Sequence, residues 1–228
     1  MKQTDSAQVA SQRVADIVAE WILSGRLPPG SRIKQDEIAT ELHVSRIPVR
    51  DALRMLEARG LVTLRPNAGA RVARSSGRDM ELNYRMREAL EPMLLAESLP
   101  HLVDIDIERM RETLHALRDA ADVETFLPLD RQFHWIAFQR HQAPQLAQAV
   151  ERLWDTGQSY RRAYAKLALK NGGRILHTEQ ELYFGAIERR ELEIAQSALI
   201  LHIRRTRTGL SSYGHLIDAE PVIRTSRL

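Results

Sequence analysis

The chain has 228 residues, of which 43% are hydrophobic, and it carries 33 lysines and arginines against 30 acidic residues. It contains no cysteine, which excludes disulfides, thiolate zinc sites and cysteine nucleophiles. No apolar run approaches the roughly 20 residues that span a bilayer, and the N-terminal segment lacks the apolar core of a signal peptide. We expect a folded, cytoplasmic protein of one large or two modest domains, without a membrane partner.

Positive charge is concentrated toward the N-terminus. Residues 1–78 contain 13 lysines and arginines against 8 acidic residues, whereas residues 79–228 contain 20 against 22. A basic N-terminal part is typical of a surface that meets a polyanion such as DNA. Many solvated helices show a similar excess, so the choice between a DNA-binding surface and an ordinary solvated face depends on the motifs.

The first predicted helix covers residues 6–24, where apolar residues recur every three or four positions. The sequence GRLPPG (25–30) ends it, because Gly25 tolerates a left-handed conformation and the two prolines cannot continue a helix. A second, short helix is predicted over residues 35–42.

A third helix is predicted over residues 46–59, with Ser45 as its N-cap and Pro48 tolerated in its first turn. Helix, short turn and helix form the unit that lays its second helix in the major groove of DNA. The apolar side chains of this helix that we expect to be buried are Val49, Ala52, Leu53 and Leu56.

Arg46, Arg50 and Arg54 recur every four residues on another face of the third helix. Arginines in this arrangement suit guanine edges and phosphates. A solvated arginine face is the alternative, and for an isolated helix it is the more common one. The residues that follow favour DNA binding.

Residues 60–74 predict a small β-hairpin, with strands over 61–65 and 70–73 joined by a turn at PNAG. Such a wing can place Gly69, which Arg65 and Arg71 flank, against the sugar-phosphate backbone or the minor groove. The hairpin completes a winged helix-turn-helix domain over residues 1–74.

The segment from LPPG to GARV, with the motifs PPG, VSRIPVRDAL and LEARGLV in order, resembles the winged-helix domain of GntR-family transcriptional regulators. The resemblance implies that Arg46 and Arg50 contact operator bases and phosphates, and that the wing enters the adjacent groove. His43 stands where glycine is usual, and Ala68 where a basic wing-tip residue is common. The expected DNA-binding residues are Ser45, Arg46, Pro48, Arg50, Arg54, Gly69 and Arg71.

The remainder of the chain predicts helices only, after a polar linker at 75–79. The expected fold class is therefore mainly α, with an antiparallel bundle of six to seven helices over 80–210 and a C-terminal tail at 211–228. The predicted helices cover 80–98, 105–121, 123–140, 145–169, 174–189 and 191–208. The basic stretches RRAYAK (161–166) and HIRRTRTG (202–209) are interpreted as exposed faces of bundle helices rather than as nucleic-acid contacts.

A few polar residues lie in apolar helical surroundings. Asp130 and His134 are four residues apart on one helix, His177 and Gln180 lie on another, and His202 lies on the last. A lone histidine of this kind is usually a hydrogen-bonded core residue. If several converge, imidazole and carboxylate without sulfur suit a divalent ion of the Zn²⁺, Ni²⁺ or Mn²⁺ type.

The motifs MREALEP (86–92), DRQFH (130–134) and the segment 179–203 resemble the FCD ligand-binding domain of the FadR subfamily. The resemblance implies an effector and metal site whose residues fall on Arg87, Asp130, His134, Gln180 and His202. Gln180 replaces an expected histidine. Three outcomes stay open: a weaker metal site that uses the Gln180 oxygen, recruitment of His177, or a metal-free pocket that binds the effector directly. Arg87 is expected to pair with an organic-acid carboxylate, with a salt bridge as the alternative.

The expected function is a ligand-responsive transcriptional regulator, with repression favoured. It would bind a pseudo-palindromic DNA operator as a homodimer and respond to a small carboxylated metabolite. One alternative is a helical metal-dependent hydrolase that uses Asp130, His134 and His202, but no separate general base is apparent and the DNA-binding module would be unexplained. Another is an architectural DNA-binding protein without a ligand pocket.

Overall fold

A computed structural model describes residues 2–66, 69–74, 76–170 and 172–212. The described chain is mainly helical, with one small three-stranded sheet, as the sequence predicted. Contacts divide it into two compact units, one of Met1–Ser75 with Ala143–Ser159 and the other of Ser76–Gln142 with Tyr160–Leu228. Two elements of the sequence interpretation, the wing-tip residue Ala68 and the tail beyond residue 212, lie outside the described residues.

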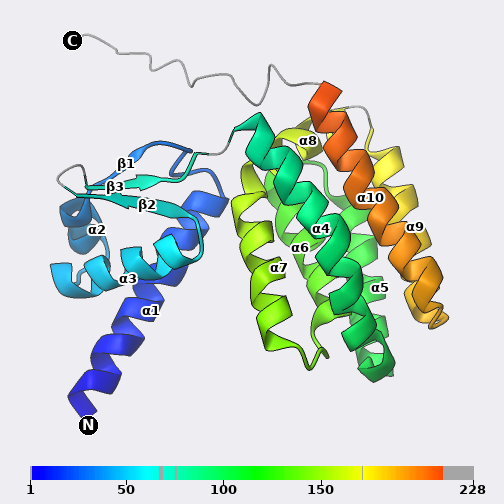
Figure 1. The fold of residues 1–228 in the computed structure, drawn as a ribbon, viewed down its shortest axis with the longest axis horizontal. Coiled ribbons are helices and arrows are strands. Elements are labelled where there is room, and N and C mark those ends of the chain that lie inside the picture. Colours follow the sequence, from blue (N-terminus) through cyan, green and yellow to red (C-terminus); the bar gives the residue numbers. More distant parts are fainter. Residues whose placement is uncertain (1, 67–68, 75, 171, 213–228) are drawn as a thin grey trace. The chain divides into compact units, whose positions relative to one another are not determined.

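The first unit begins with three helices, α1 (Lys2–Leu23), α2 (Gln35–Glu41) and α3 (Arg46–Ala58) (Figure 1). All three were predicted. α1 packs against α3 and α2 packs against α3, around a core that continues under the sheet. Gly25, just beyond α1, has a φ of 82°, the left-handed conformation that its position after a helix predicted.

The sheet contains β1 (Arg32–Ile33), β2 (Val62–Arg65) and β3 (Gly69–Val72), all antiparallel in the order β1-β3-β2. β2 and β3 form the predicted wing, with Arg65 paired to Gly69. β1 was not predicted. Two residues carry no periodic signal, and β1 exists because the free edge of β3 offers it backbone partners.

The second unit is a helical bundle in which α4 packs against α10 and α6, while α9 packs against α10 and α5. None of the described helices is both long and apolar enough to cross a membrane. Its elements are α4 (Gly77–Ser98), the 3-10 turn η1 (Leu99–His101), α5 (Asp104–Asp119), α6 (Val123–Phe138), α8 (Gln158–Lys170), α9 (Arg174–Glu188) and α10 (Leu192–Ser212).

The single helix predicted over residues 145–169 is wrong, because the structure has two helices there, α7 (Pro144–Thr156) and α8. The break falls at Gly157, a residue that weakens a helix by about 1 kcal/mol relative to alanine. The hydroxyl of the preceding Thr156 donates to the carbonyl of Arg152 at 2.8 Å, a bond that loosens the local backbone ladder. α7 belongs by its contacts to the first unit and α8 to the second.

α4 begins three residues earlier than predicted, at Gly77. Ser76 and Asp79 form a capping box: the Asp79 amide donates to the Ser76 hydroxyl at 3.2 Å, and the Ser76 amide donates to the Asp79 carboxylate at 2.8 Å. The polar first turn carried no apolar periodicity, so the sequence interpretation assigned it to the linker. The cap places Met80 and Tyr84 on the buried face of the helix.

Candidate DNA-binding face and buried polar site

Helix α3 carries its apolar and basic residues on separate faces. Val49, Ala52, Leu53 and Leu56 are buried in the core of the first unit. The side chains of Arg46, Arg50 and Arg54 are 74%, 58% and 66% exposed. Packing of one face therefore fixes the helix and turns the arginine row toward solvent.

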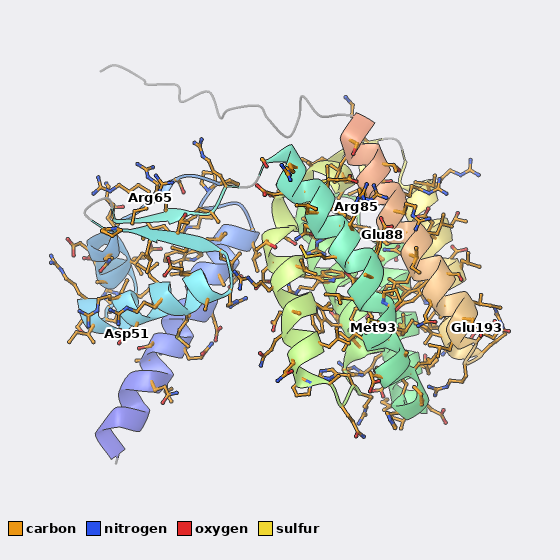
Figure 2. All side chains as sticks on the ribbon, in the orientation of Figure 1. Asp51, Arg65, Arg85, Glu88, Met93 and Glu193 are labelled. Carbon is orange, nitrogen blue, oxygen red and sulfur yellow. The ribbon has the colours of Figure 1, made fainter. Side chains whose placement is uncertain are left out.

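The arginines of α3 lie near exposed acidic residues. Arg46 lies 2.5 Å from Asp36, and Arg50 and Arg54 lie 3.8 and 3.7 Å from Asp51, which Figure 2 labels on this helix. Exposed pairs of this kind contribute about 0–1 kcal/mol. Phosphates or guanine edges can therefore replace the carboxylates at small cost.

The turn before α3 differs from the sequence interpretation in one respect. Ser45 occupies the N-cap position with an extended backbone, but within the described residues its side chain makes no capping hydrogen bond. The hydroxyl is thus not committed to the helix. Pro48 lies in the first turn of α3, where backbone N–H groups have no acceptor within the helix. The N–H that proline lacks therefore removes no helical hydrogen bond.

Beside the wing the surface is hollowed, with a volume of about 420 Å³. Arg71 donates to the carbonyl of Gly30 at 3.1 Å, so this predicted DNA contact also braces the loop before β1. Gly69 has a φ of 77°, and no described atom would meet a Cβ there within 4 Å. The residues that line the hollow are Gly30, Thr63, Arg65, Gly69, Arg71, Val72, Ala73 and Arg74.

Three arginines thus surround a concave basic surface suited to a phosphate group. The sequence interpretation missed Arg74, which it placed at the end of the winged domain without a role. A Cβ added to Gly30 would lie 1.8 Å from the Arg74 Nε atom, so the guanidinium lies directly over this glycine. The glycine of PPG was the available signal, because a residue without a side chain permits such close approach.

In the helical bundle, Asp130 on α6 is the centre of a buried polar cluster and is 6% exposed. Its Oδ1 atom accepts a hydrogen bond from Gln180 Nε2 at 3.1 Å, and its Oδ2 atom accepts one from Arg161 Nη1 at 3.3 Å. The Nε2 atom of His134, one turn along α6, lies 3.8 Å from Oδ1. Three helices, α6, α8 and α9, therefore meet at one carboxylate.

Asp130, His134 and His202 each bring a ligand atom within 4.8 Å of the others, which is the convergence that the resemblance implied. The rings of His134 and His202 stack with centroids 5.5 Å apart. His202 Nδ1 lies 3.0 Å from Glu179 Oε2, a carboxylate that the sequence interpretation did not consider. The other suggested ligand, His177, lies beside Gly173 rather than in this cluster.

Arg87 is buried on α4, and its Nε atom donates to Glu91 Oε1 at 2.5 Å within the same helix. Its guanidinium carbon also lies 5.1 Å from the centre of the Tyr84 ring. The positive charge of Arg87 acts on both Asp130 and His134. Arg87 therefore combines the salt bridge that the sequence left as an alternative with a place near the predicted effector site.

Burial shifts several titratable groups in this cluster. Burial, followed by electrostatic interaction with His202 and by the positive charges of Arg87 and Arg161, holds the pKa of His134 well below its usual value, so this imidazole is neutral at pH 7. Burial lowers the pKa of Arg161 to about 10, partly offset by Asp130, so its charge is retained. Burial raises the pKa of Tyr84 to about 12 and that of Tyr183 well above its usual value, so both phenols keep their protons.

Arg161 corrects one interpretation of the sequence. RRAYAK was assigned to an exposed helix face, but Arg161 is 6% exposed and faces the Asp130 carboxylate. Residues Arg161 and Ala165, four apart, share the buried face of α8. The sequence interpretation did not identify this buried face, because it treated residues 145–169 as one continuous helix and so assigned the wrong side of α8 to solvent.

The arginines of HIRRTRTG on α10 also form specific pairs. Arg207 lies 2.7 Å from Glu88 and 2.8 Å from Glu81, and Arg204 lies 3.1 Å from Glu88, which Figure 2 labels on α4. Arg205 pairs with Glu179. This basic stretch connects α10 to α4 and α9, which leaves the DNA-binding role to the first unit.

Two protein families match the chain. The family described as "Bacterial regulatory proteins, gntR family" matches residues 10–72, and the FCD domain matches residues 81–205. The first match covers α2, α3 and the wing, and the second covers the helices that carry Asp130, His134, Gln180 and His202.

Curated relatives and solved structures agree with these matches. The HTH-type transcriptional repressor RspR of Escherichia coli is 23% identical over 210 residues, which cover 89% of each chain. A probable D-xylose utilization operon transcriptional repressor of Paenarthrobacter nicotinovorans is 33% identical over 135 residues, covering 58% of this chain and 59% of the relative. The structure of E. coli McbR/YncC superposes with a TM-score of 0.80 at 22% identity, covering 90% of this chain and 98% of that one.

A GntR structure from Rhodococcus sp. RHA1 superposes with a TM-score of 0.74 at 20% identity, covering 89% of this chain and 97% of that one. The McbR/YncC structure and the Rhodococcus structure both share the fold of this chain. The family and the named relatives are transcriptional regulators rather than enzymes, so the hydrolase alternative is wrong. The chain belongs to the gntR family of bacterial regulatory proteins and is a DNA-binding transcriptional regulator that carries an FCD domain.

Proposed function

We propose that this regulator is a FadR-subfamily repressor that binds a pseudo-palindromic operator as a homodimer and that a small carboxylated metabolite controls its affinity for DNA. The observation that carries the DNA-binding part is the row of Arg46, Arg50 and Arg54, which a buried apolar face holds toward solvent. The relatives named as repressors support repression. The winged domain is proposed to span 1–74 and the effector domain 80–210.

The size of the DNA-binding surface supports a homodimer. One short recognition helix and one small wing reach only a few base pairs and phosphates. Two copies, spaced by one turn of the double helix, double the number of phosphate contacts and read a two-fold symmetric site.

The face of α4 that we propose for the dimer contact is apolar and exposed. Leu82, Met86 and Met93 are 48%, 47% and 54% exposed, and their spacing of three or four residues, with Ala89 between them, puts them on one side of the helix. Exposed apolar rows of this kind mark interaction surfaces. Glu97 lies one turn beyond Met93, whereas Arg85 lies between Leu82 and Met86 and pairs with Glu81 of the same helix at 2.7 Å. An antiparallel second copy that sets Ala89 opposite Met93 of the partner subunit would bring each Arg85 beside Glu97 of the partner subunit.

The proposed effector site is the buried polar cluster around Asp130. The hydroxyls of Tyr84 and Tyr183 and the Oε1 atom of Gln180 are buried without a hydrogen-bond partner among the described residues. Buried polar atoms of this kind are rare and point to a ligand or water that completes them. Two protonated phenols and the nearby guanidinium of Arg87 are donors, which suits the carboxylate of a small acid.

The divalent-metal hypothesis fits this donor set poorly. Asp130, His134 and His202 remain as three candidate ligands, but His177 lies elsewhere and Gln180 turns its amide nitrogen toward Asp130. The carboxylate also already faces the charge of Arg161. Of the three outcomes that the sequence left open, we propose the metal-free pocket, in which these residues bind the effector directly.

Fluorescence anisotropy with a labelled duplex tests this function. The duplex carries the DNA upstream of the chain's own gene, and small mono- and dicarboxylic acids are added in turn. The expected result is specific binding with a stoichiometry of two chains per operator, weakened by at least one acid that also raises the melting temperature. Binding that no acid changes, or that scrambled DNA matches at moderate salt, contradicts the proposal.

A further inference from the structure

The carboxylate of Asp130 is occupied on both oxygens by groups of this chain. A carboxylate only accepts hydrogen bonds, so the part of the Gln180 amide that faces Oδ1 at 3.1 Å must be the NH₂ group. The guanidinium of Arg161 approaches the other oxygen at 3.3 Å. These two bonds use one acceptor site on each oxygen, so an ion bound to Asp130 would have to share the carboxylate with the Arg161 guanidinium.

Arg161 also supplies the charge that an ion would otherwise bring. A buried carboxylate needs a positive partner, because transfer of an isolated charge from water into the protein interior is strongly unfavourable. Arg161 and Asp130 are each 6% exposed, and both lie in the interior of the bundle. A divalent ion bound to Asp130 would lie within a few ångströms of this guanidinium, and the two positive charges would repel each other.

A second guanidinium and a phenol complete the surroundings. Tyr84 is 1% exposed, and its ionisation is coupled to the charges of Arg87, Arg161 and Asp130. Its hydroxyl has no hydrogen-bond partner among the described residues. Two guanidiniums, Arg87 and Arg161, and two carboxylates, Asp130 and Glu91, act on this hydroxyl, and its retained proton can donate to an anionic ligand.

We propose that Arg161, held by Asp130, takes the place of a metal ion in this site, so that the site binds an anionic ligand without metal. Gln180 is the matching change: a histidine at this position would offer a ring nitrogen to an ion, whereas the amide donates to Asp130 and leaves the carboxylate to Arg161. The inference rests on the proposed effector site and names the residue that recognises the acid. Arg161 contacts the ligand's carboxylate, and Arg87 and Tyr84 add donors.

The test is a Zn²⁺ titration of the full chain after treatment with EDTA, followed by isothermal calorimetry and by metal analysis of the dialysed protein. Four proteins are compared: the natural chain, Gln180→His, Gln180→His with Arg161→Met, and Gln180→His with Arg162→Met. Arg162 neighbours Arg161 on α8 but pairs with Glu124, so its removal controls for the loss of a positive charge.

The expected result is weak Zn²⁺ binding by the natural chain and at least about tenfold tighter binding by the variant without Arg161 than by the Arg162 control. Binding of one Zn²⁺ by the natural chain as tightly as by Gln180→His with Arg161→Met overturns the proposal. So does equal affinity of the Arg161 and Arg162 variants.

A second measurement covers the case in which Arg161→Met does not fold, which circular dichroism would show. Arg161→Lys keeps the positive charge, and with Gln180→His it is expected to bind Zn²⁺ no more tightly than Gln180→His alone; tighter binding overturns the proposal. These titrations contain no DNA, so their failure is distinguishable from failure of operator binding. Metal content is also independent of the identity of the effector.

Discussion

The amide nitrogen of Gln180 on α9 lies 3.1 Å from the Oδ1 atom of Asp130 on α6 and donates a hydrogen bond to it. The contact joins two helices through the centre of the bundle, and Arg161 on α8 completes it from the other side. One buried carboxylate therefore organises three helices. We expect these partners to contribute to the stability of the bundle and to favour the kind of ligand proposed for this site.

Replacing Gln180 by Leu should lower the free energy of unfolding by about 1–3 kcal/mol, because the buried Asp130 oxygen loses a donor that no solvent replaces. Urea unfolding, followed by circular dichroism, measures the change. Gln148→Leu on the exposed face of α7 serves as the control and should be nearly neutral. A loss no larger than that of the control would show that the Asp130–Gln180 bond contributes little.

Replacing Arg50 by Ala should weaken operator binding by about 1–3 kcal/mol, because an exposed arginine in the middle of the recognition row is placed for a base or phosphate contact. Fluorescence anisotropy at several salt concentrations measures both the affinity and its salt dependence. Arg118→Ala removes a comparable exposed arginine from α5, where it pairs with Glu181, and should leave affinity unchanged. Equal effects of the two substitutions would remove α3 from the interface.

Replacing Gly30 by Ala should destabilise the first unit by roughly 1–2 kcal/mol, because this residue has a φ of 79°. The new Cβ would also displace the Arg74 guanidinium from the basic hollow, so operator affinity should fall. Gly77→Ala is the matched control, since no described atom lies within 4 Å of a Cβ there. Thermal unfolding and anisotropy separate the two effects. Unchanged DNA affinity in a folded Gly30→Ala chain would exclude the hollow from phosphate binding.

The capping box of α4 should make stability depend on acidity. The hydrogen bond from the Ser76 backbone, then that from the Ser76 hydroxyl, lowers the pKa of Asp79 from 3.8. A carboxylate with a lowered pKa stabilises the native state fully above its unfolded pKa, and this contribution is lost as the pH falls through the folded pKa. Asp79→Asn should therefore cost about 0.5–1 kcal/mol at pH 7 and less at pH 3. Urea unfolding of both chains at the two pH values is the measurement, and a cost that stays constant would show that the Asp79 charge is not involved.

Replacing Met86 by Glu should weaken self-association by at least about tenfold, because a charge would enter the apolar row of α4. Light scattering over a dilution series measures the association. Leu182→Glu on α9 changes another exposed apolar residue and should not alter it.

A charge exchange makes the dimer prediction sharper. Arg85→Glu and Glu97→Arg should each weaken the dimer, and the double substitution should restore it if these residues face each other across a two-fold axis. Failure of the double variant to recover would assign the contact to another surface or another arrangement of α4.

The sequence by itself determined the DNA-binding unit well, for a physical reason. Its helices bury apolar residues at regular spacing, which the sequence shows directly. Its turns contain residues such as Gly25, whose left-handed conformation can be predicted from the residue type and its place after a helix. The arginine row of α3 could be read from spacing alone, because a buried Val49 face fixes where Arg50 points. The sequence also indicated that Asp130 and His134 lie on one face of a helix, because residues four positions apart are separated by about one turn.

Tertiary structure alone decided the rest. β1 exists only because β3 offers it an edge, and the break at Gly157 changed the phase of α8 and turned Arg161 inward. No local pattern records that Gln180 donates to Asp130 from a helix 50 residues away. A buried charge pairs with whatever groups the packed helices place around it, so the chemistry of the proposed effector site depends on contacts between residues far apart in the chain.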